Sequence, residues 1–169
     1  MSRLPKILAQ ATKGRNGFTL WDDFAVEVET ALLLFSLVRQ SKPLLAIESG
    51  TGQGISTAFI AEALVMNGEG ELVTFETSDF FADAARESMK GLPVTVEQGL
   101  SRTTQRRPQF VFLDGATDER VAEITFWLTH PNRPLTVVHD ARRDYPFHLA
   151  EGVYIPGNDG VWIGRAKEQ

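Results

Sequence analysis

A glycine-rich loop between an apolar run and a helical pattern is the feature that most limits the fold of this chain. The apolar run covers residues 44–47, the loop reads Glu-Ser-Gly-Thr-Gly-Gln-Gly over residues 48–54, and the helical pattern follows over residues 55–61. Glycine at alternate positions lets the backbone turn sharply and removes the Cβ atoms that would keep a ligand away from the main chain. A strand, a bare turn and a helix in this order indicate a loop for a nucleotide-type cofactor.

Apolar runs alternate with helical patterns along most of the chain after this loop. The rhythm is typical of βαβ units, so we expect an α/β protein with a Rossmann-like, doubly wound, mostly parallel sheet. The last two apolar runs flank a turn-rich linker and predict a C-terminal antiparallel hairpin at one edge of the sheet. The predicted strands are 44–49, 71–76, 93–97, 110–113, 135–138, 152–155 and 161–164, and the predicted helices are 54–66, 79–90 and 117–129.

The length and composition predict one domain. With 169 residues, of which 43% are hydrophobic, the chain can bury one core, and two domains would be cramped. We expect a single domain over residues 1–169, with an N-terminal helical and lid segment at 1–43 and an α/β core at 44–169. In the N-terminal segment, Asp22 is predicted to cap a helix, and Phe18 offers an apolar contact for a mobile lid.

The overall charge and the absence of cysteine narrow the function classes. A net charge of −5 argues against a general nucleic-acid binder, which normally presents an excess of lysine and arginine to the phosphates. No apolar run is long enough to predict a membrane span. The lack of cysteine excludes disulfides, thiol catalysis and thiolate metal sites, and it favours a reducing compartment, so we expect a cytoplasmic protein. The expected partner is a small molecule, and a homodimer is left open.

The spacing of the loop glycines separates the candidate cofactors. A dinucleotide fingerprint that starts at Gly50 would need glycine at the place of Ile55. A P-loop would need lysine and then serine or threonine after its last glycine, but Gly54 is followed by Ile55 and Ser56. Dinucleotides such as NAD and nucleoside triphosphates, which both contain a pyrophosphate, are therefore disfavoured. A NAD-linked Rossmann protein stays as the second alternative. Alternating glycines after the acid Glu48 suit a cofactor without a pyrophosphate.

The loop and the strand ends that follow it resemble the class I S-adenosylmethionine (SAM)-dependent methyltransferases, particularly the small O-methyltransferase-like branch. The resemblance covers about residues 44–165 and implies a trimmed class I methyltransferase fold in a single SAM-binding domain. It extends through Glu76, Leu-Asp-Gly at 113–115 and Val-His-Asp at 138–140. Within the loop, the matching residues are Glu48, Gly50, Gly52, Gly54 and Ser56.

This resemblance implies cofactor contacts at the ends of the first two predicted strands. The glycine loop, including Thr51, would cradle the amino-acid and ribose portion of SAM, and Glu48 would help to hold its ammonium group indirectly. Glu76 would take the two ribose hydroxyls, because an ionised carboxylate can accept from both in a charge-assisted pair.

The adenine end of SAM would lie after the third predicted strand, near Gly99, Leu100 and Ser101. Many relatives carry an acid near the adenine amino group, and Leu100 departs from that pattern. Adenine contact would therefore rest on backbone groups, Ser101 and apolar packing. The aromatic pair at residues 80–81 is a candidate cover for the adenine face, and Asp114 is a further cofactor-binding candidate.

The candidate catalytic groups follow the fourth and fifth predicted strands. Asp114 and Asp140 end what should be adjacent strands, so their carboxylates are expected to converge above the cofactor. Asp140 is the leading candidate for a base, and Asp114 is the second. His139 is a further catalytic candidate, and the alternative for it is a hydrogen-bonded structural histidine. If the strand geometry persists through both residues, His139 and Asp140 point to opposite sides.

The same neighbourhood raises the question of a metal. Cation-dependent relatives contribute two acids and an asparagine there, and oxygen ligands of that kind suit magnesium. In this chain Ala141 follows Asp140, which departs from the pattern, so magnesium is not favoured. If a metal binds, Asp114 and Asp140 are its predicted ligands.

The predicted function is SAM-dependent methyl transfer to an oxygen, or less so a nitrogen, of a small-molecule acceptor. Nucleic-acid bases are disfavoured as acceptors, because the Pro-Pro-Tyr motif of amino-methylating enzymes does not follow the fourth predicted strand. The alternative is a catalytically silent SAM-binding module that regulates or scaffolds a partner. Residues 141–150 favour it in one respect, since they leave little room for the long helix usual before the hairpin.

Overall fold

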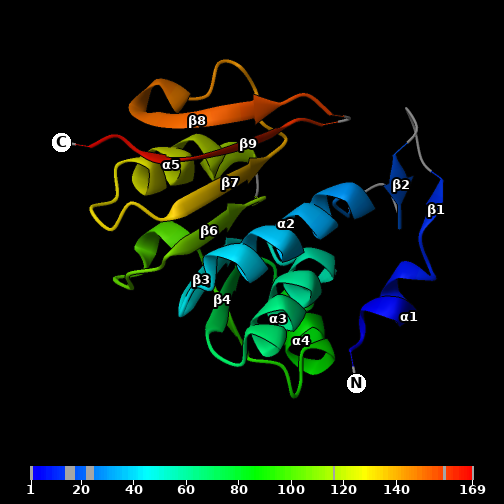
Figure 1. The fold of residues 1–169 in the computed structure, drawn as a ribbon. Coiled ribbons are helices and arrows are strands. Elements are labelled where there is room, and N and C mark those ends of the chain that lie inside the picture. Colours follow the sequence, from blue (N-terminus) through cyan, green and yellow to red (C-terminus); the bar gives the residue numbers. More distant parts are fainter. Residues whose placement is uncertain (1, 14–17, 22–24, 116, 158, 169) are drawn as a thin grey trace.

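The fold is a seven-stranded sheet with helices on both faces (Figure 1). The computed structural model of the chain describes residues 2–13, 18–21, 25–115, 117–157 and 159–168. The strands of the sheet are β3 (Leu45–Ser49), β4 (Glu71–Glu76), β5 (Val94–Gln98), β6 (Phe110–Leu113), β7 (Leu135–His139), β8 (Ala150–Ile155) and β9 (Val161–Ala166).

The pairing of these strands confirms the predicted mostly parallel sheet with a C-terminal hairpin. The spatial order is β5-β4-β3-β6-β7-β9-β8. The first five strands in this order are parallel, β9 is antiparallel to β7, and β8 is antiparallel to β9. The chain builds outward from β3 to β5 and then returns to place β6 on the other side of β3. Ligands bind at such a switch point, outside the carboxyl ends of the strands.

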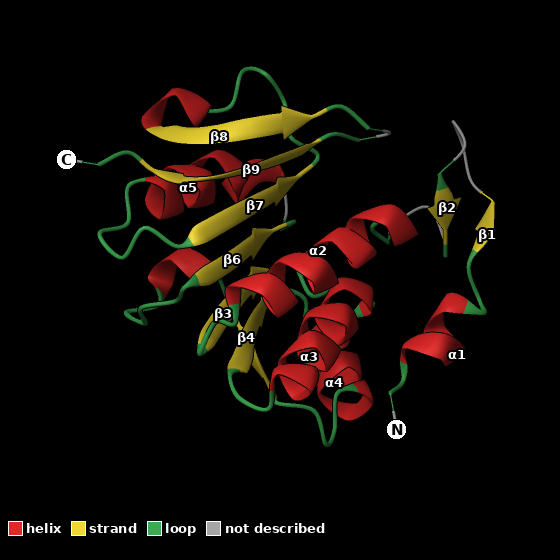
Figure 2. Ribbon diagram, viewed as in Figure 1, coloured by secondary structure: helices red, strands yellow, loops and turns green. Residues whose placement is uncertain are grey.

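The helices form two layers (Figure 2). Helices α2, α3 and α4 lie on one face of the sheet, and α5 lies on the other. None of the helices in the described ranges has the length and apolar content to cross a membrane. The helical elements are α1 (Leu4–Leu8), α2 (Val28–Ser41), α3 (Ile55–Asn67), α4 (Asp79–Ser88), α5 (Thr117–Leu128), η2 (Ser101–Thr103) and η3 (Phe147–Leu149), and two short strands, β1 (Thr12–Lys13) and β2 (Thr19–Leu20), pair near the N-terminus.

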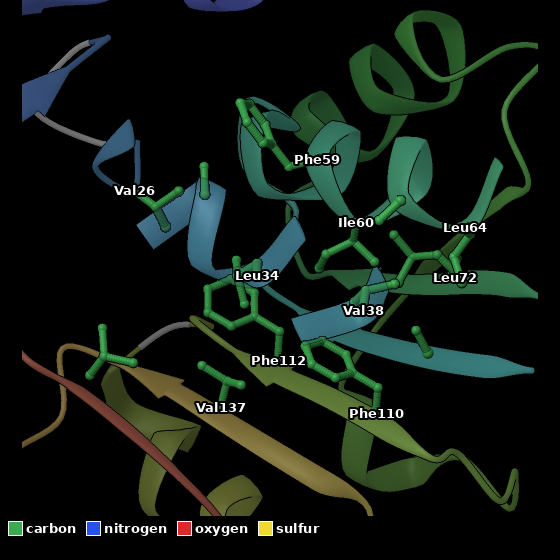
Figure 3. Close-up of a cluster of buried hydrophobic side chains, with 14 residues drawn as sticks. Val26, Leu34, Val38, Phe59, Ile60, Leu64, Leu72, Phe110, Phe112 and Val137 are labelled. Carbon is green, nitrogen blue, oxygen red and sulfur yellow. The ribbon is translucent and has the colours of Figure 1, made fainter. Parts of the chain in front are cut away.

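The central strands are apolar on both faces because each face is covered by a helix layer. Phe110 and Phe112 of β6 belong to the cluster that contains Leu34 of α2 (Figure 3). Val111, between them, belongs instead to the cluster that contains Trp127 of α5. This alternation follows from the two-residue period of a strand, and it fixes which face each helix covers.

The N-terminal segment differs in part from the sequence prediction. Asp22 lies outside the described residues, and α2 begins at Val28 with Glu27 in extended conformation at its N-cap. Phe18, predicted for a lid, lines a small cavity of about 100 Å³ with Pro156 and Gly157 of the hairpin turn. Phe18 therefore contacts the turn between β8 and β9.

Replacing Phe112 with alanine tests this core. The side chain is fully buried, so its removal leaves a cavity, and we expect the free energy of unfolding to fall by about 3–5 kcal/mol. Phe80 is the matched control because it is 76% exposed, and Phe80→Ala should change the free energy of unfolding by no more than about 0.5 kcal/mol. Urea denaturation measures both values, and equal losses would contradict the assignment of the core.

Candidate functional site

A cavity of about 410 Å³ opens at the carboxyl ends of β3, β4, β5 and β6. It lies at the switch point where the sheet topology predicts a ligand site. Most of the predicted cofactor residues line it, whereas Glu48, Gly54 and Ser101 lie outside the lining. The predicted residues in the lining are Gly50, Thr51, Gly52, Ser56, Glu76, Gly99, Leu100 and Asp114, and other residues in the lining include Ala25, Val26, Gln53, Ile55, Phe81, Gly115 and Glu123.

The glycine loop touches the end of β6 at Gly50. A Cβ atom there would lie 2.5 Å from the carbonyl oxygen of Asp114, and Gly50 has φ of +88°. Its N–H group donates to the carbonyl oxygen of Phe75 at 2.9 Å. A side chain would disrupt this contact, so glycine is required for the loop to close the space between β4 and β6.

The carboxylate of Glu76 is fixed at the cavity wall by the backbone. Its Oε2 accepts a hydrogen bond from the N–H of Gly52 at 2.9 Å, and its Oε1 accepts one from the N–H of Ser78 at 2.9 Å. Each carboxylate oxygen can accept a further hydrogen bond. The glycine loop therefore positions an acid that has acceptor capacity left for a ligand.

Glu48 lies beneath the loop instead of in the cavity lining. Its side chain is fully buried, and Oε2 accepts a hydrogen bond from the hydroxyl of Thr57 at 2.6 Å. Oε1 has no hydrogen-bond partner among the described residues. Burial raises the pKa of Glu48 to about 7, although the hydrogen bond from Thr57 opposes the increase. The side chain supports the start of α3, and a direct contact with a ligand in the cavity is not available to it.

Ser101 is also buried, because α5 takes up its polar groups. Its N–H and its hydroxyl donate to Oε1 of Glu123 at 2.9 and 2.6 Å, and its hydroxyl accepts from Nε1 of Trp127 at 3.0 Å. Oε2 of Glu123 accepts from the hydroxyl of Ser49 at 2.6 Å. Glu123 therefore ties the ends of β3 and β5 to α5, and it lines the cavity where Ser101 does not.

The two members of the aromatic pair differ in position. Phe81 lines the cavity, where Leu100 also lies, and Phe80 is 76% exposed. The rings of the two residues contact each other edge to face, with centroids 5.4 Å apart. Of the pair, Phe81 is therefore the one that can pack against a ligand.

A buried ionic cluster lies beside the cavity, where α2 meets the ends of β6 and β7. Nε2 of His139 is 2.9 Å from Oε2 of Glu27, and Nδ1 is 3.2 Å from Oδ1 of Asp114. Burial alone would lower the pKa of His139, but its hydrogen bonds to Asp114 and Glu27 outweigh this effect and raise the pKa to about 10. Burial likewise opposes the ionisation of Glu27, yet the hydrogen bond from His139 lowers the pKa of Glu27 to about 2. The imidazole is thus a charged, buried link between two acids.

Asp140 does not point away from His139, because the strand geometry on which that prediction depended does not persist through Asp140. The strand ends at His139, and Asp140 has the left-handed conformation with φ of +50°. Its Oδ1 lies 3.8 Å from Nδ1 of His139, and its Oδ2 lies 3.7 Å from Nη1 of Arg120. Asp140 and Asp114 therefore meet the same two cationic side chains, although Asp140 is not part of the cavity lining.

The sequence prediction omits three charged residues of this region: Arg120, Glu123 and Glu27. All three are buried, with 2–6% of their surface exposed. Arg120 and Glu123 lie one helical turn apart and share the inward face of α5 with Trp127. The helical period of α5 could have indicated Arg120 and Glu123, because it places both charged residues among the buried positions.

Solved structures of methyltransferases share this fold. A methyltransferase of Podospora anserina with bound S-adenosylhomocysteine (SAH) has a TM-score of 0.71 and 18% identity, and the match covers 86% of this chain and 81% of that chain. The O-methyltransferase of Streptomyces achromogenes involved in tomaymycin synthesis, in complex with SAM, has a TM-score of 0.69 and 24% identity, with 86% and 83% covered. An O-methyltransferase of Bacillus cereus in complex with SAH has a TM-score of 0.69 and 20% identity, with 86% and 84% covered.

The chain has the methyltransferase fold. This finding confirms the fold that the resemblance implies. No model of a known protein family matches the sequence, and no curated protein matches it.

Glu48→Gln tests the buried carboxyl group beneath the loop. Because the pKa of Glu48 is raised from 4.5 to about 7 on folding, the folded protein binds more protons than the unfolded chain in this window. The wild type therefore loses stability as the pH rises from 4.5 to 7. Glutamine stays neutral, so the variant should match the wild type near pH 4.5 and exceed it by roughly 3 kcal/mol at about pH 8.

Urea denaturation of both proteins at the two pH values measures this difference. A difference in the free energy of unfolding that stays constant with pH would show that Glu48 is not the titrating group.

Proposed function

We propose that this protein binds SAM in the cavity of about 410 Å³ and transfers its methyl group to an oxygen of a small-molecule acceptor. The observation that carries the proposal is the carboxylate of Glu76, which two backbone N–H groups hold at the wall of the cavity. The SAM and SAH complexes of proteins with the same fold support it.

Three parts of the cavity match three parts of SAM. Glu76 is the proposed acceptor for the two ribose hydroxyls, because each of its oxygens retains acceptor capacity. The bare backbone from Gly50 to Gly52 is the proposed seat of the amino-acid portion. Phe81 and Leu100 supply apolar surface for adenine. Glu48 is buried beneath the glycine loop, so its proposed role is to support the loop and not to contact SAM directly.

The methyl transfer itself depends mainly on alignment. The acceptor oxygen attacks the methyl carbon in line with the carbon–sulfur bond, that bond breaks, and its electron pair goes to sulfur to give SAH. A hydroxyl acceptor also loses its proton. Asp140 is the proposed base because its side chain is 48% exposed and lies 3.7–3.8 Å from Arg120 and His139, whereas Asp114 is 19% exposed and lies closer to both, at 3.2 Å.

We also infer that residues 1–169 form one domain that acts on a small molecule in the cytoplasm. Leu4, Ile7 and Leu8 of α1 pack against the main core cluster, which supports one domain. The net charge of −5 supports a small molecule over nucleic acid as the partner, and the absence of cysteine supports a reducing compartment.

Isothermal titration calorimetry with SAH tests the proposal. The wild type should bind SAH saturably, and Glu76→Ala should weaken binding by about a hundredfold or more, because two charge-assisted hydrogen bonds to ribose are lost. Glu87 is the matched control, since it is 74% exposed and pairs with Lys90 on the surface. Glu87→Ala should bind SAH as the wild type does.

A wild-type protein that binds no SAH would contradict the cofactor assignment. Binding of SAM without methyl transfer to any hydroxyl acceptor would support a silent SAM-binding module in its place.

A further inference from the structure

The guanidinium of Arg120 fills the space next to both acids at the ends of β6 and β7. Arg120 is 6% exposed. Nε donates to the carbonyl oxygen of Gly115 at 3.0 Å, and Nη1 donates to the carbonyl oxygen of His139 at 2.7 Å. Nη2 donates to Oδ1 of Asp114 at 3.2 Å, and Nη1 lies 3.7 Å from Oδ2 of Asp140. Backbone carbonyls from two strand ends thus hold a permanent cation against the two carboxylates.

This is also where the resemblance to cation-dependent enzymes would place a divalent ion. Asp114, His139 and Asp140 bring three donor atoms within 4.8 Å of one another. Magnesium needs near-octahedral oxygen ligands at about 2.0–2.1 Å. Ala141 offers no side-chain oxygen, and the oxygens of Asp114 and Asp140 already face the guanidinium of Arg120. The residues present therefore do not fit the ion.

The imidazole of His139 is also not available as a metal ligand. Both of its ring nitrogens face carboxylate oxygens, Nε2 toward Glu27 and Nδ1 toward Asp114. Both nitrogens already have carboxylate partners, so neither is free to bind a metal. An added divalent ion would also meet the guanidinium of Arg120 at close range, which is unfavourable by Coulomb's law.

We propose that Arg120 is the built-in cation of this site and takes the place that a divalent metal would occupy between Asp114 and Asp140. The inference rests on the proposed function, because it concerns the same cofactor and acceptor site. It follows that SAH binding needs no metal and that the site excludes divalent ions. Arg120 acts as a positioning residue, since it orients Asp114 and Asp140 and is itself covered by protein.

Manganese is the probe for this proposal, because its free ion gives an electron paramagnetic resonance signal. Titration of Mn²⁺ into the wild-type protein, with and without SAH, should leave the free-ion signal at the level of an Asp140→Asn control. SAH affinity from calorimetry should be the same in EDTA and in excess Mg²⁺. Stoichiometric binding of Mn²⁺ by the wild type that Asp140→Asn abolishes would overturn the proposal.

A gain of metal binding tests the role of the guanidinium directly. The double variant Arg120→Ala, Ala141→Asn frees the two carboxylates and adds an amide oxygen beside them. It should bind one equivalent of Mn²⁺ that the wild type leaves free. A folded double variant that binds no more Mn²⁺ than the wild type would contradict the exclusion of metal by Arg120.

The readouts separate this inference from the proposed function. If the double variant shows no cooperative thermal transition, the wild-type titration still decides the question. If the wild type binds no SAH, the proposed function fails, whatever the Mn²⁺ signal shows. If the wild type binds SAH and also binds Mn²⁺ through Asp140, only the inference about Arg120 fails.

Discussion

The imidazolium of His139 is hydrogen-bonded on both sides, to Glu27 at the start of α2 and to Asp114 at the end of β6. These bonds join the helix layer to the strand end that forms one wall of the cavity. A buried charge that loses its partner costs about 3–5 kcal/mol, so the three side chains hold one another in place. The position of Asp114 matters further, because its carbonyl oxygen is the group that Gly50 approaches.

The shape of the cavity depends on the close contact between Gly50 and the end of β6. With Gly50 against the end of β6, the glycine loop presents its backbone to the cavity, and the N–H of Gly52 orients the carboxylate of Glu76. Main-chain groups thus prepare the proposed cofactor site, and such groups do not lose side-chain entropy on binding. Asp114 and Asp140, the acids of the proposed acceptor site, are instead held by the guanidinium of Arg120 and the imidazolium of His139.

The sequence predicts the strands, the glycine loop and the place of Glu76 at the end of a strand, because these depend on local patterns: apolar runs, helical periods and glycine spacing. It does not predict the ionic cluster, because Glu27 and His139 are 112 residues apart and meet only in the folded chain. Asp140 faces the same side as His139 because its own backbone is in the left-handed conformation, and no strand pattern in the sequence reveals this. Arg120 and Glu123 could be predicted in part. The helical period of α5 places both at buried positions, but it does not indicate which residues they contact.

A crystal structure of the protein with SAH, grown in the presence of Mg²⁺, tests the account most directly. We expect the ribose hydroxyls on Glu76, adenine between Phe81 and Leu100, and the guanidinium of Arg120 still against Asp114 and Asp140. SAH bound outside the cavity, or a metal ion between Asp114 and Asp140 with Arg120 displaced, would contradict it.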